Sequence, residues 1–137
     1  MQRALLMQSS QLETLHEHAE GALPLEAVAL LFGQVMESQV EVASIELMEN
    51  MANSSTSFEV DPEREYRLLV DAEERGQDLV GIFHSHPALP EPSARDKRNM
   101  KVNPVVWLIA SKLTGRWECN AFVYEDERVQ RVEIVLG

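Results

Sequence analysis

The sequence predicts a mixed α/β domain in which helices cover a mixed β-sheet. Two segments begin with helix-capping patterns, and they stand among several apolar or alternating runs that are typical of strands. This irregular order of helix and strand favours a sheet with helices packed against it. A chain of 137 residues is long enough to bury one core. We therefore expect residues 1–137 to form a single domain.

The expected strands are apolar or alternating runs bounded by turn-forming residues. Residues 78–86 are apolar on both faces, which predicts a central place in the sheet. The last run alternates Val132, Ile134 and Leu136. The full set of expected strands comprises residues 3–8, 26–35, 40–48, a short stretch ending the polar loop 49–60, 78–86, 103–111, 116–124 and 128–136.

The two expected helices follow from their first residues. Ser10 with Glu13 three residues later is a capping-box pattern. Asp61 is a favourable cap for the second helix, Pro62 suits its first position, and Gly76 ends it. The apolar faces are expected to carry Leu12, Leu15 and Ala19 in the first helix and Tyr66, Leu69 and Val70 in the second.

Charge and cysteine content exclude several classes of protein. The formal net charge of -11 offers no basic face for phosphates, so nucleic acid is not expected as a partner. No apolar run has the length of a membrane span, and the first residues lack a signal-peptide pattern. The single cysteine, Cys119, excludes a disulfide framework and a Cys-rich zinc finger, and we expect it to be a small buried residue. A cytoplasmic location is expected.

Two His-x-His triplets occur, and geometry separates them. Residues i and i+2 of a strand point to the same face, so His84 and His86 project side by side. In a helix the same spacing puts side chains on nearly opposite sides, so His16 and His18 are expected to be half-exposed helix residues. Ser85 points away from both strand histidines, which favours a packing or supporting role.

A carboxylate follows the second triplet. Pro87 ends the strand and begins a proline-rich loop that leads to Ser93 and Asp96. Two imidazoles and a carboxylate are a common catalytic zinc set that leaves a fourth position for water, and Pro87 would help to hold the ligands in place. A purely structural alternative stays open, in which Ser93 and Asp96 only cap a helix and the histidines are polar groups at a sheet edge.

These motifs resemble those of the JAMM (MPN+) metalloprotease family. The resemblance rests on HSHP, on SARD as S-x-x-D, and on an upstream glutamate in LPLEAVALLFG. The words FEVDP, AEERGQDLVGIFHSHP and WLIAS extend it over nearly the whole chain. It implies the cytidine-deaminase-like MPN/JAMM fold, one catalytic domain over residues 1–137, and a minimal prokaryotic member.

The resemblance also implies the roles of five residues. His84, His86 and Asp96 would bind one Zn²⁺ per chain, with water as the fourth ligand. Glu26 would be the general acid/base, and Ser93 would donate a hydrogen bond to the oxyanion. Only the resemblance distinguishes Glu26 from the other acidic residues.

Two departures from the family pattern are visible. Nine residues separate His86 from Asp96 where the family usually has ten, which is expected to shift Asp96 or Ser93. Val28 and Ala29 replace the Cys and Gly of the common EACGLL word. We also expect none of the additional regions of large eukaryotic relatives.

The resemblance implies hydrolysis of the amide or isopeptide bond after the C-terminal glycine of a ubiquitin-like or sulfur-carrier protein. The acidic chain would favour a basic modifier tail. The alternative is a catalytically silent MPN-type scaffold that binds partners. A zinc deaminase would need more than one cysteine, and a Ser-His-Asp hydrolase built on Ser93 lacks a nucleophile elbow. Because family members often pair, a homodimer is a further alternative.

Overall fold

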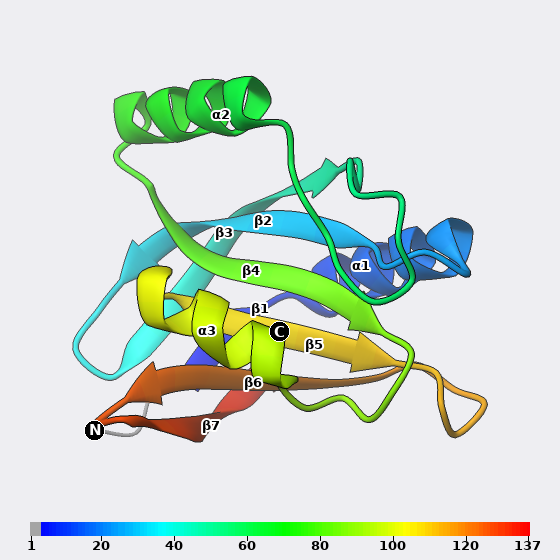
Figure 1. The fold of residues 1–137 in the computed structure, drawn as a ribbon. Coiled ribbons are helices and arrows are strands. Elements are labelled where there is room, and N and C mark those ends of the chain that lie inside the picture. Colours follow the sequence, from blue (N-terminus) through cyan, green and yellow to red (C-terminus); the bar gives the residue numbers. More distant parts are fainter. Residues whose placement is uncertain (1–3) are drawn as a thin grey trace.

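The computed structural model describes residues 4–137, and seven strands in this part of the chain form one sheet that closes on itself (Figure 1). The order of strands round the sheet is β1-β3-β2-β4-β5-β6-β7, with β1 also paired to β7. The elements are β1 (Ala4–Met7), α1 (Ser9–Ala22), β2 (Val28–Val35), β3 (Gln39–Met48), α2 (Pro62–Glu74), β4 (Asp78–His86), α3 (Ala94–Val102), β5 (Val106–Ser111), β6 (Glu118–Glu125) and β7 (Arg128–Leu136).

The predicted mixed sheet with helices against it is confirmed, but its closure was not predicted. Strand β4 runs parallel to β5, and β1 runs parallel to both β3 and β7, whereas the other pairs are antiparallel. Closure depends on β1, in which Leu5 pairs with Val40 on one side and Ile134 on the other. A run of four residues carries no sign of such distant partners. Its predicted first residue, Arg3, lies outside the described residues.

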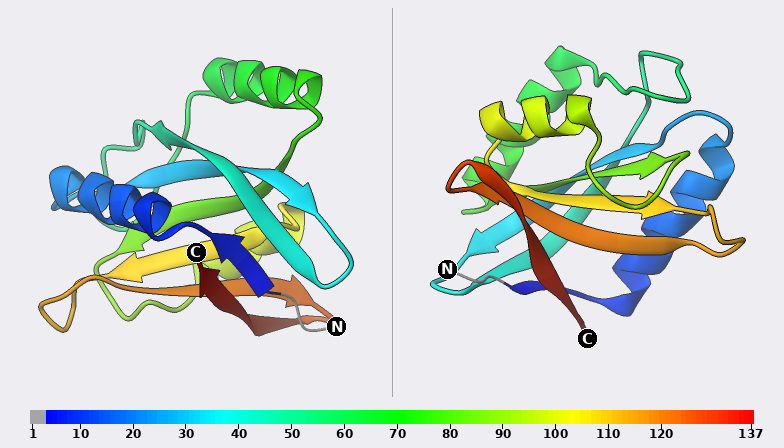
Figure 2. Two further views of the ribbon diagram at one scale, coloured as in Figure 1. Left: turned by 180° about the vertical axis from the view of Figure 1, so that it is seen from behind. Right: turned by 60° about the horizontal axis from the view of Figure 1, so that its bottom comes forward.

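Apolar side chains fill both faces of the sheet. Helix α1 covers one face with Leu15 and Ala19, and the view from behind shows it lying across the strands (Figure 2). Helices α2 and α3 cover the other face with Ala72 and Met100. Because side chains alternate along a strand, β4 contributes to both cores.

The predicted start of α2 is confirmed, whereas that of α1 is wrong. Helix α2 begins as predicted, with Asp61 Oδ1 accepting a hydrogen bond from Glu63 N at 3.1 Å. The Ser10 cap was wrong, because α1 starts at Ser9 and its cap is Gln8. The side chain of Gln11 accepts a hydrogen bond from Gln8 N at 2.9 Å, a role that glutamine shares with glutamate in a capping box.

Two further predictions were wrong in detail. Tyr66 is 67% exposed, because α2 turns Leu68, Leu69 and Ala72 toward the sheet instead. The polar segment 49–60 is a loop, as predicted, but no strand ends it. Ser57 O and Glu59 N bond to the side chain of Asn50, and Glu59 O accepts from Met51 N within the same loop.

The crossover from β4 through α3 to the parallel strand β5 creates the position for a site. Strand β4 lies between β2 and β5, as its apolar character predicted. The loop 87–93 leaves the carboxyl end of β4 and leads directly into α3. In α/β proteins, closed or open, ligands commonly bind at the carboxyl ends of parallel strands. In residues 4–137, no helix combines the length and the apolar character that a bilayer crossing requires.

Candidate metal-dependent active site

The two strand histidines lie at the carboxyl end of β4, on the sheet face that α2 and α3 cover. His84 is fully buried and is flanked in the sheet by Val28 of β2 and Ile109 of β5. The alternative of polar groups at a sheet edge was therefore wrong. Ser85 points to the opposite face, as predicted, and its hydroxyl bonds to the backbone before β2.

Asp96 comes to these histidines from the first turn of α3. Ser93 Oγ accepts a hydrogen bond from Asp96 N at 3.1 Å, and Asp96 Oδ2 accepts one from Ser93 N at 2.8 Å. The helix-cap prediction is thus confirmed. The same carboxylate places Oδ1 3.2 Å from His84 Nε2 and Oδ2 3.9 Å from His86 Nε2. The nine-residue loop therefore still brings Asp96 to both imidazoles.

Hydrogen bonds at the other ring nitrogens orient both imidazoles. His84 Nδ1 lies 3.2 Å from the carbonyl oxygen of Ser85, and His86 Nδ1 lies 3.0 Å from that of Leu89. A carbonyl oxygen can only accept, so these contacts favour a proton on each Nδ1. In the neutral ring, which is the form that binds a metal, the lone pair of each imidazole then lies on Nε2, the nitrogen nearer Asp96. Metal-ligating histidines are commonly held in this way.

The nitrogen and oxygen atoms of His84, His86 and Asp96 are of the types that bind metals, although they are not arranged as a coordination sphere. Within residues 4–137, no three His, Cys, Asp or Glu side chains stand in a metal-binding arrangement. The fit lies in the chemistry of the donors. His84 Nε2 is buried and has no well-directed hydrogen bond from the described residues, and a neutral imidazole beside a carboxylate is a common zinc set.

Glu26 lies just before β2 and is nearly fully buried. Its Oε1 is 3.2 Å from His84 Nδ1. Two hydrogen bonds attach the adjoining residue to β4: Ala27 N donates to Ser85 Oγ at 2.8 Å, and Ser85 N donates to the carbonyl oxygen of Ala27 at 3.0 Å. Ser85 therefore holds the backbone segment that carries Glu26.

Asn50 holds the same segment from the loop side, and no sequence pattern singles it out. Its Nδ2 donates to the carbonyl oxygens of Glu26 at 2.9 Å and Ser57 at 3.0 Å. Its Oδ1 accepts from the backbone N–H groups of Ala52 and Glu59. An asparagine in a polar loop is an ordinary turn residue, so no local signal distinguishes it.

Carboxylates on both sides of His84 determine its charge in the metal-free protein. Burial lowers the pKa of His84, but the contacts with Asp96 and Glu26 outweigh burial and raise the pKa to about 9. Burial raises the pKa of Asp96, yet the contact with His84 and the hydrogen bonds with Ser93 hold it below its usual value.

Aromatic rings and the proline-rich loop enclose the histidines. Phe58 and Trp107 place their ring centroids 5.1 Å and 6.0 Å from that of His84. The loop that begins at Pro87 is fixed to β6, because Asn120 Nδ2 donates to the carbonyl oxygen of Pro90 at 3.1 Å. The two rings thus help to bury His84 completely, and the fixed loop contacts His86 through the carbonyl oxygen of Leu89.

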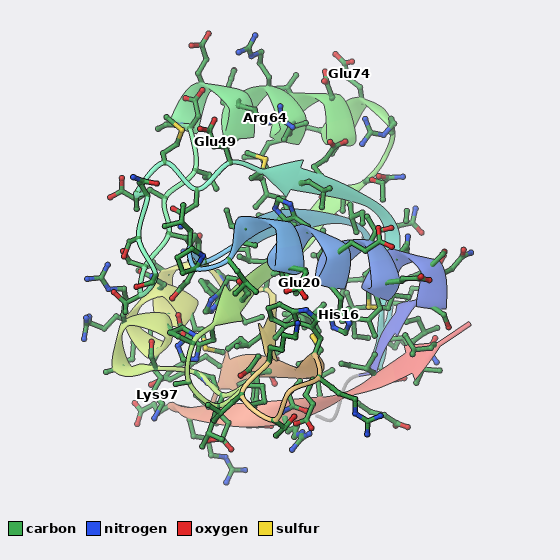
Figure 3. The ribbon with its side chains drawn as sticks, turned by 90° about the vertical axis from the view of Figure 1, so that its right-hand side faces the viewer. His16, Glu20, Glu49, Arg64, Glu74 and Lys97 are labelled. Atoms are coloured by element: carbon green, nitrogen blue, oxygen red, sulfur yellow. The ribbon has the colours of Figure 1, made fainter. Side chains whose placement is uncertain are left out.

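The first His-x-His triplet does not join this site. His16 and His18 are half-buried on α1, as predicted (Figure 3 labels His16). His16 stacks on Trp117 at 6.2 Å, whereas His18 Nε2 lies 3.0 Å from the carbonyl oxygen of Val28. The two side chains thus have separate partners.

Comparison with known proteins gives the class that this fold and site define. The family model "Prokaryotic homologs of the JAB domain" matches residues 8–123. The chain therefore belongs to this family, and it is a small prokaryotic-type JAMM/MPN member and a hydrolase.

Among individual relatives, the chain is similar to two proteins named desampylase. It is 36% identical to that of Pyrococcus furiosus over 82% of this chain and 76% of the relative. It is 32% identical to that of Haloferax volcanii over 86% of this chain and 84% of the relative. A match to a histone deubiquitinase of Xenopus laevis, at 35% identity, covers 60% of this chain but 10% of that much longer protein.

Solved structures agree with the fold. The solution structure of a Desulfitobacterium hafniense protein has a TM-score of 0.85 at 32% identity and covers 97% of this chain and 92% of that one. A Salinibacter ruber protein has a TM-score of 0.71 at 26% identity, with 100% and 92% covered. These neighbours support a single α/β domain.

Proposed function

We propose that this protein is a zinc-dependent isopeptidase acting on conjugates of a ubiquitin-like or sulfur-carrier protein, with residues 1–137 as one catalytic domain. One observation carries the proposal: the Nε2 atoms of His84 and His86 face the carboxylate of Asp96, and Glu26 contacts the imidazole of His84. The similarity to proteins named desampylase supports a modifier conjugate as the substrate class.

His84, His86 and Asp96 would hold the metal. Their other donors and acceptors are already satisfied by Ser85, Leu89 and Ser93, which leaves the two Nε2 lone pairs and Asp96 Oδ1 for ligation. A bound zinc ion supplies Lewis acidity, which polarises a carbonyl group and makes water nucleophilic near neutral pH.

Glu26 would act as the general base and then the general acid. The burial of this carboxylate and its contact with His84 support the role, in which it would take a proton from the attacking water. As the bond to the leaving amine breaks, the same carboxyl returns that proton to the amine nitrogen. Ser85 and Asn50 would act through Glu26, because both hold its backbone segment.

Ser93 would stabilise the oxyanion of the tetrahedral intermediate. Its Oγ accepts a hydrogen bond from Asp96 N, which leaves the hydroxyl proton free to donate. A hydroxyl directed at developing negative charge strengthens binding of the transition state over that of the substrate. In residues 4–137, Ser93 Oγ makes no hydrogen bond to an imidazole, so a serine nucleophile activated by histidine is not supported.

The test uses a ubiquitin-like protein joined through its C-terminal glycine to the lysine of a labelled peptide. The zinc-loaded protein is expected to release the peptide, and Glu26→Gln is expected to abolish release. Glu37→Gln, an exposed change of the same kind, should leave the rate unchanged. Binding of the conjugate without cleavage by the zinc-loaded protein would favour the silent scaffold instead. Cytoplasmic location and homodimerisation remain proposals for separate experiments.

A further inference from the structure

Helix α3 is strongly basic in an otherwise acidic chain. It carries four of the 12 lysines and arginines, against a formal net charge of -11 for the whole protein. All four are exposed, whereas its only acidic residue, Asp96, is buried against His84. The basic side chains are those of Arg95, Lys97, Arg98 and Lys101.

These charges are not neutralised by the described part of the protein. Among residues 4–137, no carboxylate forms an ion pair with Arg95, Lys97 or Arg98. Lys101 instead lies over the ring of Tyr124, with Nζ 5.5 Å from the ring centroid. The helix therefore presents free cations beside the candidate active site.

The four cations divide between two flanks of α3. Helical spacing puts Arg95 and Arg98 together on one flank, and Lys97 and Lys101 on the other. Figure 3 shows Lys97 at the outer edge of the molecule. Only the two arginines line the cleft that leads to the site.

That cleft has a volume of ≈ 350 Å³ and runs between α3 and the loop 56–59. Three carboxylates line it. Glu26 and Asp96 lie at its base, where both contact His84. Glu59, on the loop side of the cleft, is exposed. Apart from the two carboxylates that contact His84, the cleft therefore carries two positive charges and one negative charge.

We propose that Arg95 and Arg98 bind acidic side chains of the substrate close to the scissile bond. Guanidinium groups pair with carboxylates through two parallel hydrogen bonds, and two of them at one cleft favour an acidic segment over a neutral one. The inference rests on the proposed function for the location of the cut bond. It differs from the expectation that net charge alone suggests, which is a basic modifier tail.

The test compares two fluorescent isopeptide probes that differ only in having Glu or Gln on both sides of the scissile bond. Binding is measured by anisotropy in a Glu26→Gln background, so that the probes stay intact. We expect the Glu probe to bind about five- to ten-fold more tightly. Arg95→Gln with Arg98→Gln should remove this preference. Lys97→Gln with Lys101→Gln, which changes net charge equally on the same helix, should keep it.

Equal losses in the two double variants, or no preference for the Glu probe, would overturn the inference. Thermal melting of each variant shows whether it is folded, and exposed positions are expected to tolerate these changes. Cleavage by the protein with Glu26 intact is measured separately. Failure to cut either probe counts against the proposed function, whereas the anisotropy comparison still decides the inference.

Discussion

Ser85→Ala is expected to loosen the segment that carries Glu26 without touching the proposed metal ligands. Ser85 Oγ is the acceptor for Ala27 N at 2.8 Å, and both residues are buried. Alanine fits the space but leaves that backbone N–H without its acceptor. A buried donor without a partner costs about 1–3 kcal/mol.

For a domain of this length the cost corresponds to a melting temperature lower by about 3–10 °C. Differential scanning calorimetry measures the shift. Ser44→Ala is a matched control, because Ser44 is half-buried and its only side-chain hydrogen bond within residues 4–137, to Gln77 Oε1, is long at 3.5 Å. It should lose less than about 1 kcal/mol.

Ser85→Ala is also expected to have lower isopeptidase activity at temperatures where the variant is folded, since Glu26 is no longer held in place. Equal melting temperatures for Ser85→Ala and Ser44→Ala would show that the Ala27 hydrogen bond does not anchor this segment. Full activity in Ser85→Ala would show that the anchor does not position the general base.

Three further changes test other parts of the account. Gly33→Ala should lower the free energy of unfolding, measured in urea, by more than about 1 kcal/mol, because the new Cβ would lie 1.8 Å from the carbonyl oxygen of Glu41. Gly21→Ala is the control, since its Cβ would meet open space. Similar urea midpoints for the two variants would contradict the prediction. Ser93→Ala should lower kcat roughly 100-fold, because the oxyanion loses a hydrogen-bond donor. It should also lower the free energy of unfolding by about 1 kcal/mol, because α3 loses its N-cap. An unchanged kcat would contradict the oxyanion role. Cys119, expected to be buried, is half-buried, and burial raises the pKa of its thiol. It should therefore react with a disulfide reagent at pH 8 more slowly in the native than in the denatured protein, and equal rates would contradict this.

The local features of the site were predictable from the sequence because they depend on short-range geometry. The alternation of a strand placed His84 and His86 on one face and Ser85 on the other, and the structure agrees. The pattern PSARD predicted a helix start, and its capping box is present. Both interpretations of Asp96 fit together, because one carboxylate oxygen caps α3 and the other faces His84.

Features that depend on distant partners were not predictable. Leu5 closes the sheet by pairing with Val40 and Ile134, which no local pattern of β1 reveals. Asn50 gains its role only because the loop folds back onto the segment of Glu26. The shortened loop was expected to shift Asp96 or Ser93, yet Asp96 Oδ1 still lies 3.2 Å from His84 Nε2. A hydrogen bond from Asn120 of β6 to the carbonyl oxygen of Pro90 fixes that loop, and no local pattern of the loop reveals this partner.

The zinc content of the purified protein tests the central claim most directly. Mass spectrometry of protein loaded with zinc and then dialysed should give about one zinc per chain in the wild type. His86→Ala should lose the zinc. His16→Ala should keep it, because His16 belongs to the other triplet and stacks on Trp117. No zinc in the wild type, or equal zinc in His86→Ala, would contradict the proposed metal site and leave the silent scaffold as the better account.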